Sequence, residues 1–229
     1  MQNQVLISGA SGNLGKDVVK KLTDLDFGLH MNIRNPRSGA YLEQANVFTY
    51  KADLSDPSES EQFVTNAISK AGSIQAGVLL AGGFAMGEIA DTTSAEIDKM
   101  VTLNFMTAFN LVKPLIAHFE ANGGGQFVFI GARPALEAEQ GFGSFAYTLS
   151  KSLIFQMADM INSAHKDKNI TASVIVPSII DTPDNRAAMP NEDFNKWVSG
   201  SDIAEAIAFI LSDTGRRLRQ TVLKVYNEA

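Results

Sequence analysis

Apolar and polar positions follow two different periods along this chain. Short continuous apolar runs alternate with longer segments in which apolar residues recur every three or four positions, so strands alternate with helices. The short runs predict seven strands, over 4–8, 29–34, 47–50, 77–81, 126–130, 170–176 and 222–226. Strands that are apolar throughout are typical of a parallel sheet that is buried on both faces.

The helical periodicity predicts five main helices, over 16–25, 57–71, 94–122, 144–166 and 201–211. We expect Ser94 to cap the third helix, and Pro114 to kink or break it because proline lacks the amide hydrogen. We find no internal repeat and no linker, which predicts a single domain over 1–229. The predicted fold class is α/β, a doubly wound and mostly parallel seven-stranded sheet with helices on both faces.

Composition narrows the possible functions. The chain has 229 residues, of which 45% are apolar and 19% are charged, an ordinary globular balance. Its net charge of −6 argues against nucleic acid as the main partner. The sequence has no cysteine and three isolated histidines (His30, His118 and His165), so we expect no disulfide and no zinc site. We expect a cytoplasmic protein without a membrane partner, because no signal peptide is evident and no apolar run reaches the roughly 18 residues of a span.

A glycine-rich loop joins the first predicted strand to the first predicted helix. Gly9, Gly12 and Gly15 are spaced so that backbone amides can approach a pyrophosphate at the N-terminus of the helix. The residues between them belong to the same candidate dinucleotide site: Ser11, Asn13 and Leu14. A tight turn that binds no ligand is the alternative. The position of the loop between strand one and helix one favours the dinucleotide.

The end of the second predicted strand bears on the choice of cofactor. NAD-binding folds usually carry an acidic residue there for the ribose hydroxyls, but residues 29–41 contain none. Arg34, with Arg37 as a second candidate, would instead face the 2′-phosphate of NADP, unless it points to solvent. We therefore expect NADP(H), with NAD(H) less favoured. Asp53 and Leu54, after the third strand, are candidates to contact adenine, unless Asp53 only caps a turn.

A second chemical signal is the pair Tyr147 and Lys151. These residues are four positions apart on one predicted helix and therefore share a face. A phenol with a pKa near 10 is a poor acid or base at neutral pH, but an ammonium and a bound nicotinamide cation would favour the phenolate. Lowering that pKa to about 7 takes roughly 4 kcal/mol of electrostatic stabilisation. The pair therefore predicts a proton donor and the group that tunes it.

Together these motifs resemble the short-chain dehydrogenase/reductase family over essentially the whole chain. The segments that carry the resemblance are SGASGNLG at 8–15, LLAGG at 79–83, LNF at 103–105, YTLSK at 147–151 and VPSIIDTP at 176–183. The resemblance implies a Rossmann-type fold in which Tyr147 is the acid/base and Lys151 its partner. It also implies that Asn104 holds a water that connects Lys151 to bulk solvent, whereas bonds to nearby backbone are the alternative for Asn104. Further residues are implied to bind the cofactor: Ala81, Gly82, Gly83, Pro177 and Thr182.

Three departures from the family pattern affect the chemistry. The glycine spacing is G-x-x-G-x-x-G, the segment after strand four reads LAGG, and Ala132 stands where a catalytic serine is expected. Loss of such an oxyanion donor can cost about 10²–10³ in rate. Ser144 is a poor substitute because it lies in another segment. A quinone-like or imine-like acceptor develops less oxyanion charge, and the segments AGGFAMG, GARPAL and DTPDNRAAMP are similar to dihydropteridine reductases.

A long polar loop over 178–197 is predicted to lie on the substrate side. It follows the sixth strand, at the carboxyl edge where open α/β sheets bind their ligands. Its candidate substrate contacts, each with a surface or core role as the alternative, are Asp181, Asn185, Arg186, Met189 and Trp197. Phe84 and Phe142 would stack on a planar ring or pack in the core.

Both long predicted helices are apolar on more than one side, which favours a partner subunit over one face. The family resemblance implies a homodimer or homotetramer through these helices, with a monomer as the alternative. The predicted function is hydride transfer between NADP(H) and a small carbonyl-, quinone- or quinonoid-pterin-like substrate, with Tyr147 as proton donor. Two alternatives stay open. One is a non-catalytic NADP(H)-sensing protein that has lost the catalytic serine, and the other is a ketone or alcohol dehydrogenase with another oxyanion donor.

Overall fold

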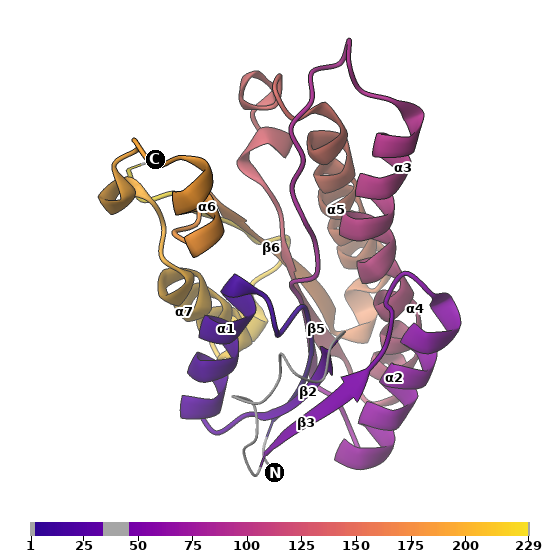
Figure 1. Ribbon diagram of the computed structural model, residues 1–229. Coiled ribbons are helices and arrows are strands. Elements are labelled where there is room, and N and C mark those ends of the chain that lie inside the picture. The colour runs from indigo at the N-terminus through magenta and orange to yellow at the C-terminus, as the bar shows by residue number, and fades with distance from the viewer. Residues whose placement is uncertain (1–2, 34–45, 229) are drawn as a thin grey trace.

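Seven strands form one sheet in the order β3-β2-β1-β4-β5-β6-β7, and each neighbouring pair is parallel. The computed structural model describes residues 3–33 and 46–228 (Figure 1). The strands are β1 (Gln4–Ser8), β2 (Gly28–Ile33), β3 (Val47–Lys51), β4 (Ala76–Leu79), β5 (Gly125–Ile130), β6 (Ile170–Pro177) and β7 (Val222–Val225). The strand order reverses between β1 and β4, which confirms the predicted doubly wound fold class.

Helices cover both faces of the sheet (Figure 1). Successive side chains of a strand point to opposite faces, so Val5 and Ile7 pack on one side of β1 while Leu6 packs on the other. The first side is covered by α1 (Asn13–Asp24) and α7 (Gly200–Leu211). The second side is covered by α2 (Pro57–Ala71), α4 (Thr107–Ala121) and α5 (Phe145–Ala164). The remaining α-helices are α3 (Ser94–Val101), which packs against α5, and the short α6 (Pro183–Ala188).

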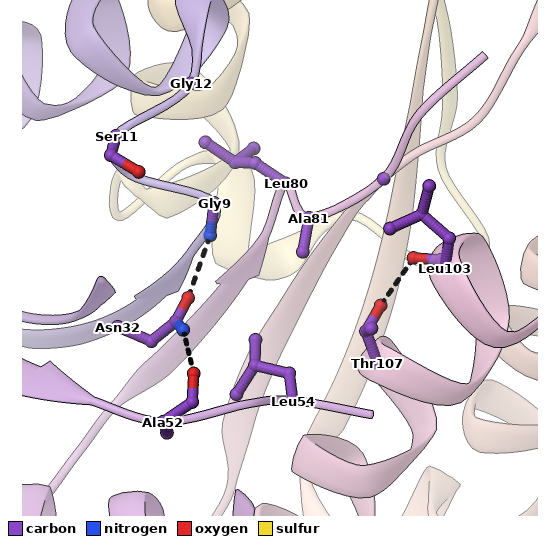
Figure 2. Close-up of a pocket in the computed structure, with 11 residues that line it drawn as sticks. Gly9, Ser11, Gly12, Asn32, Ala52, Leu54, Leu80, Ala81, Leu103 and Thr107 are labelled. Carbon is purple, nitrogen blue, oxygen red and sulfur yellow. Dashed lines mark hydrogen bonds between the residues drawn. The ribbon is translucent and has the colours of Figure 1, made fainter. Parts of the chain in front are cut away.

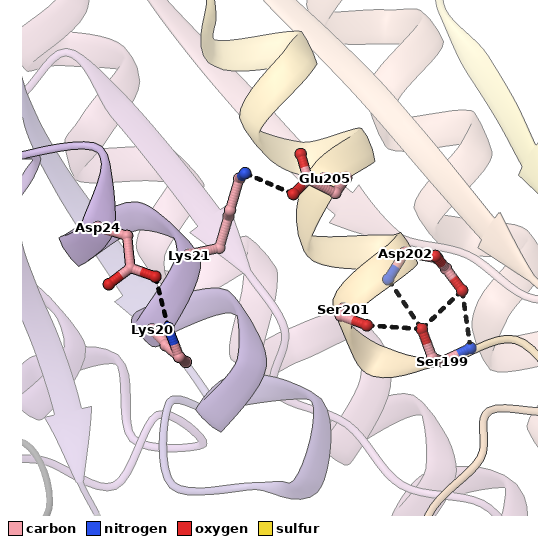
Figure 3. Close-up of polar contacts among 7 residues, drawn as sticks. All are labelled: Lys20, Lys21, Asp24, Ser199, Ser201, Asp202 and Glu205. Carbon is pink, nitrogen blue, oxygen red and sulfur yellow. Dashed lines mark hydrogen bonds and ion pairs between the residues drawn. The ribbon is translucent and has the colours of Figure 1, made fainter.

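Polar contacts fix the ends of the α1–α7 pair (Figure 3). Ser199 caps α7, because its hydroxyl accepts a bond from the amide of Asp202 at 3.0 Å and the Asp202 carboxylate accepts one from the Ser199 amide. Lys21 of α1 forms an ion pair with Glu205 of α7. An exposed pair of this kind contributes at most about 1 kcal/mol, so the buried apolar faces of the two helices hold them together.

The long helix expected over 94–122 is interrupted, but not at its proline. A π-helical turn, Thr102–Met106, separates α3 from α4, and α4 runs on through Pro114. The predicted break at Pro114 is therefore wrong. Leu111 and Leu115, fully buried on either side of this proline, hold the helix against the sheet. Asn104 is the buried residue of the π turn, and such turns frequently occur at functional sites.

The start of this helix also differs from the expectation. Thr93, not Ser94, is the N-cap of α3: its hydroxyl accepts a bond from the amide of Glu96, and the Glu96 carboxylate accepts one from the Thr93 amide. The glutamate three residues after Thr93 completes a capping box that Ser94 cannot form. By length and mean hydropathy the stretch Ser94–Ala121 would also suit a membrane span. In this structure its buried side chains belong to the core beside α5 and the sheet.

Candidate active site

The loop between β1 and α1 takes its shape from two glycines. Gly9 has a φ of +70°, and a Cβ atom at this position would lie 2.8 Å from the amide nitrogen of Ala81. A Cβ atom at Gly15 would collide with the backbone oxygens of Gly9 and Ala10. Gly12 is exposed and closes the turn by donating its amide hydrogen to the Gly9 carbonyl at 3.0 Å. The loop thus passes close to the end of β4 while α1 packs directly on it.

A cavity of about 380 Å³ opens at the carboxyl ends of β1 and β4 (Figure 2). Its lining comes from segments that are far apart in the sequence: Gly9, Ser11, Gly12, Asn32, Ala52, Leu54, Leu80, Ala81, Gly82, Leu103 and Thr107. The cavity therefore brings together the glycine loop, the end of β3 and the LAGG segment, as the sequence predicts. It lies where the strand order reverses, the place at which open α/β sheets bind ligands.

Asn32 on β2 is a residue of this cavity that the sequence analysis missed. Its side chain accepts a hydrogen bond from the amide of Gly9 at 3.2 Å and donates one to the carbonyl of Ala52 at 3.0 Å (Figure 2). The buried amide therefore ties the glycine loop to the end of β3. The available signal was an asparagine within an apolar strand, because a buried amide has to find hydrogen-bond partners.

Asn13, Leu14 and Thr182 line a second cavity, of about 190 Å³, between the start of α1 and the segment after β6. The side-chain amide of Asn13 donates to the Asp184 carboxylate at 2.9 Å. Thr182 caps α6 by accepting a bond from the Asn185 amide at 3.1 Å. The predicted cofactor residues that line a cavity are therefore divided between two cavities, which the glycine loop connects.

Asp53 lies beside the larger cavity and does not line it. Its carboxylate accepts bonds from the amide and the hydroxyl of Ser55, at 3.0 and 2.7 Å, so the turn-capping alternative describes its contacts. The adjacent residue Leu54 does line the cavity. Arg34 and Arg37 lie outside the described residues, so the selection of NADP over NAD stays a prediction.

Tyr147 and Lys151 lie on the first turns of α5. Burial raises the pKa of Tyr147 to about 12 and lowers the pKa of Lys151 to about 8. Both shifts disfavour the charged form, so the polypeptide by itself keeps Tyr147 as a neutral phenol. The Lys151 ammonium is anchored by a 2.9 Å bond to the carbonyl of Ile130. Burial alone therefore does not produce the phenolate expected from the sequence, which needs a positive charge close to the phenol oxygen.

Asn104 is buried next to this pair. Its side-chain oxygen accepts a bond from the amide of Gly83 at 2.8 Å, and its nitrogen donates to the hydroxyl of Ser150 at 3.0 Å. A Cβ atom on Gly82 would lie 2.6 Å from the Asn104 oxygen and 3.4 Å from the Lys151 nitrogen. The backbone of the LAGG segment therefore connects the larger cavity to Asn104 and Lys151, two of the three predicted catalytic residues.

Where a catalytic serine is expected, the structure has the buried methyl group of Ala132, directly after β5. Ser144 precedes α5, and its hydroxyl lies 3.3 Å from that of Thr148. The Ser150 hydroxyl donates to the carbonyl of Tyr147 at 2.7 Å while it accepts from Asn104. Both hydroxyls thus have partners within or beside α5.

The segment after β6 is organised by polar contacts. Pro177, the buried last residue of β6, leads into it. Arg186 forms a two-point ion pair with the Asp181 carboxylate at 2.6 and 2.7 Å, and Asn185 donates to a backbone carbonyl at 2.8 Å. Trp197 is only 5% exposed, so for this residue the core alternative holds. Met189 is half-buried at the end of α6, where its amide donates to the carbonyl of Asn185 at 2.9 Å.

Two aromatic candidates stay at the surface. Phe84 is 61% exposed and Phe142 is 74% exposed, so the core alternative is wrong for both. The Phe84 ring meets the Tyr147 ring edge-to-face, with 4.9 Å between centroids. An exposed aromatic ring therefore touches the predicted proton donor.

The geometry fits a dinucleotide. Backbone amides and glycines without obstructing side chains lie where a pyrophosphate would approach, and apolar side chains such as Leu54 and Leu103 flank them. The Lys151 nitrogen and the Asn104 side chain lie on the other side of Gly82. The arrangement can therefore hold an anionic nucleotide.

Comparisons with known proteins agree with this geometry. A family model described as short chain dehydrogenase matches residues 3–193. The chain is 29% identical to dihydropteridine reductase of Dictyostelium discoideum over 216 residues, which is 90% of this chain and 87% of that protein. It is 23% identical to the 3-oxoacyl-(acyl-carrier-protein) reductase MabA of Mycobacterium tuberculosis, over 98% of this chain and 92% of that protein.

Solved structures show the same fold. A short-chain type dehydrogenase/reductase from Mycobacterium ulcerans superposes with a TM-score of 0.91 at 22% identity, over 100% of this chain and 90% of that one. ElxO with NADP bound superposes with a TM-score of 0.90 at 20% identity, over 99% of this chain and 98% of that one.

Proposed function

Because the chain belongs to the short-chain dehydrogenase family, we propose that it transfers hydride between NADP(H) and a small, easily reduced acceptor, with Tyr147 as the proton donor. The observation that carries the proposal is the pairing of two features. Lys151 lies beside Gly82, which lines a cavity suited to a dinucleotide, and Tyr147 precedes it by one turn of α5, whereas Ala132 has a methyl group where an oxyanion donor is expected. The site is thus equipped to deliver a proton and poorly equipped to stabilise an oxyanion.

The residues divide the work of the reaction. When bound, NADPH would supply the hydride. Tyr147 holds its proton on the phenol oxygen, consistent with a pKa of about 12, and donates it to the acceptor atom that gains negative charge. Lys151, with a pKa of about 8 and anchored on Ile130, carries its positive charge at pH 7 and stabilises the phenolate that remains. Solvent then returns a proton to Tyr147.

The missing serine supports a particular class of acceptor. Quinones and quinonoid dihydropterins accept hydride readily and spread the resulting charge, so they depend less on an oxyanion donor. The similarity to a dihydropteridine reductase points the same way. Simple ketones, which concentrate the charge on one oxygen, should be poor substrates.

The proposal extends to cofactor, assembly and location. Arg34 supports NADP(H), as does the similarity to a structure with NADP bound. Apolar side chains that stay exposed on α4 and α5 support a homodimer or homotetramer through these helices: Phe109, Leu149, Leu153 and Met160. We also propose a cytoplasmic location.

Steady-state oxidation of NADPH tests the proposal. The acceptors are a quinonoid dihydropterin, several quinones and several simple ketones, with NADH run in parallel. Turnover of the first two classes, with NADPH preferred, is expected. Turnover of ketones alone would mean that another group replaces the serine, and no turnover despite NADPH binding would indicate a cofactor sensor.

A further inference from the structure

Two loops are joined beside Tyr147. Residues 84–89 follow β4, and residues 141–145 lead into α5 at the same end of the molecule (Figure 1). The amide of Gly87 donates to the carbonyl of Gly143 at 2.9 Å, and the amide of Phe145 donates to the carbonyl of Gly87 at 2.8 Å. These main-chain bonds hold the two loops at a fixed separation, so the side chains they carry form one surface.

Large apolar side chains project from both loops. Phe84, Met86 and Phe142, which we call the aromatic wall, are 61%, 72% and 74% exposed. The methyl group of Met86 would lie 3.5 Å from a Cβ atom on Gly143, so its tip reaches across to the second loop. Large apolar side chains gathered at one exposed place commonly mark a binding surface.

The aromatic wall is connected directly to the proton donor. The rings of Phe84 and Tyr147 are in edge-to-face contact, at 4.9 Å between centroids. An acceptor that takes the proton of Tyr147 has to lie against this tyrosine, and it therefore comes within reach of Phe84. A flat ring there gains contact with aromatic surface, whereas a small aliphatic acceptor gains little.

Resting on the proposed reductase function, we propose that Phe84 determines specificity and that the aromatic wall selects acceptors with a flat, conjugated ring. Ala132 and Phe84 then act in the same direction. Ala132 withholds a hydrogen bond from a developing oxyanion, which disfavours unactivated ketones, and Phe84 adds contact with a flat, conjugated ring.

Two vicinal dicarbonyls separate ring recognition from chemistry. Phenanthrenequinone is flat and aromatic, whereas diacetyl is small and aliphatic. In both reductions the hydride forms a C–H bond at one carbonyl carbon, the Tyr147 proton forms the O–H bond, the C=O π bond breaks and NADPH is oxidised. Any difference between the two acceptors that depends on Phe84 therefore reports on contact with the ring.

The experiment compares wild type, Phe84→Ala, Phe84→Tyr and, as a matched control, Phe209→Ala, which truncates another exposed phenylalanine on α7. We expect Phe84→Ala to lower kcat/KM for phenanthrenequinone by about tenfold or more, the loss typical of removing one ring-stacking contact. In the same variant, kcat/KM for diacetyl should change by less than about threefold, as for an ordinary surface substitution. Phe84→Tyr should retain the preference for phenanthrenequinone over diacetyl. Phe209→Ala should leave kcat/KM for both acceptors and the NADPH dissociation constant unchanged.

An equal loss of kcat/KM for both acceptors in Phe84→Ala would show that Phe84 only positions Tyr147, and it would overturn the inference. An unchanged kcat/KM for phenanthrenequinone would overturn it as well. If wild type reduces neither dicarbonyl, the aromatic wall is tested by binding alone, and the reductase proposal is judged separately with the quinonoid dihydropterin and the other quinones. Calorimetry with phenanthrol, a flat and non-reducible ligand, on the NADP⁺ complex should then show binding that Phe84→Ala weakens about tenfold. Absence of binding, or equal binding by both proteins, contradicts the inference.

Discussion

The nucleotide side of the site and its acceptor side are held by different kinds of contact. On the nucleotide side Gly9 approaches the backbone of Ala81 so closely that no Cβ atom fits, and the buried Asn32 locks the loop in place. On the acceptor side Phe84 and Phe142 are exposed and have space around them. The first side should therefore tolerate almost no substitution, whereas the second should tolerate many and change specificity with them.

The largest expected effect is at Gly9. Gly9→Ala places a Cβ atom against backbone, and we expect NADPH affinity to fall by about 100-fold or more, on the scale of a buried group that no longer fits. Gly72→Ala is the matched control, because Gly72 has a similar φ of +76° but nothing within 4 Å of its Cβ position. Gly72→Ala should lower the free energy of unfolding by only about 1–2 kcal/mol, the cost of a left-handed backbone conformation for a residue with a Cβ atom. Equal NADPH affinity in the two variants, by fluorescence titration, would contradict this account of the loop.

The next largest effect is expected for a substitution of Lys151, which should change how the free energy of unfolding depends on pH. Its pKa is about 8 in the folded protein and 10.5 in the unfolded chain, so the folded state binds fewer protons between these values and stability rises with pH across that window. Below pH 8 the full cost of burying the ammonium is present. Lys151→Met removes this cost and should stabilise the protein at pH 7 by up to about 3 kcal/mol. The gain should shrink as the pH approaches 10.

Urea unfolding of wild type and Lys151→Met at pH 7, 8, 9 and 10 checks this prediction. The series stops at pH 10 because the raised pKa of Tyr147 lowers stability between 10 and about 12. A stability difference that does not depend on pH would mean that Lys151 is not held in a desolvated position.

Arg34 tests whether the nucleotide side also sets the cofactor. If it binds the 2′-phosphate, Arg34→Asp should shift the ratio of NADPH to NADH dissociation constants by about tenfold or more and reverse the preference, as expected for a charge-assisted bond. Equilibrium titration with both cofactors measures the ratio. An unaltered preference would exclude Arg34 as the selecting residue.

The smallest effect is expected at Ser144. Its hydroxyl lies 3.3 Å from that of Thr148, in a segment that does not include the expected serine position. Ser144→Ala should change kcat/KM for quinones and ketones by less than about threefold. A loss of about 100-fold on ketones alone would instead identify Ser144 as the oxyanion donor.

Local signals predicted the elements that carry the candidate nucleotide site. Three short-range features lie on the expected elements: the glycine spacing, Pro57 at the start of α2, and Tyr147 four residues before Lys151. The π turn at Thr102–Met106 was not predictable, because α and π turns have nearly the same apolar periodicity over five residues. Asn32 was missed for a different reason, since its partners Gly9 and Ala52 are distant in the sequence and meet only in the sheet.

The acceptor side was harder to predict from the sequence. Whether Phe84 and Trp197 are buried depends on which loops cover them, and composition does not determine that. The structure buries Trp197 and exposes Phe84, although both were open to either outcome. Patterns in the chain predict the backbone-built half of the site better than the half built from loop side chains.

A comparison of wild type with Tyr147→Phe tests directly whether Tyr147 donates the proton. The rate of NADPH oxidation with the best acceptor is measured for both proteins, together with their NADPH dissociation constants. If Tyr147 donates the proton, kcat falls by about 10²–10⁴ while cofactor binding stays nearly unchanged. A variant that keeps the wild-type rate would show that another group delivers the proton.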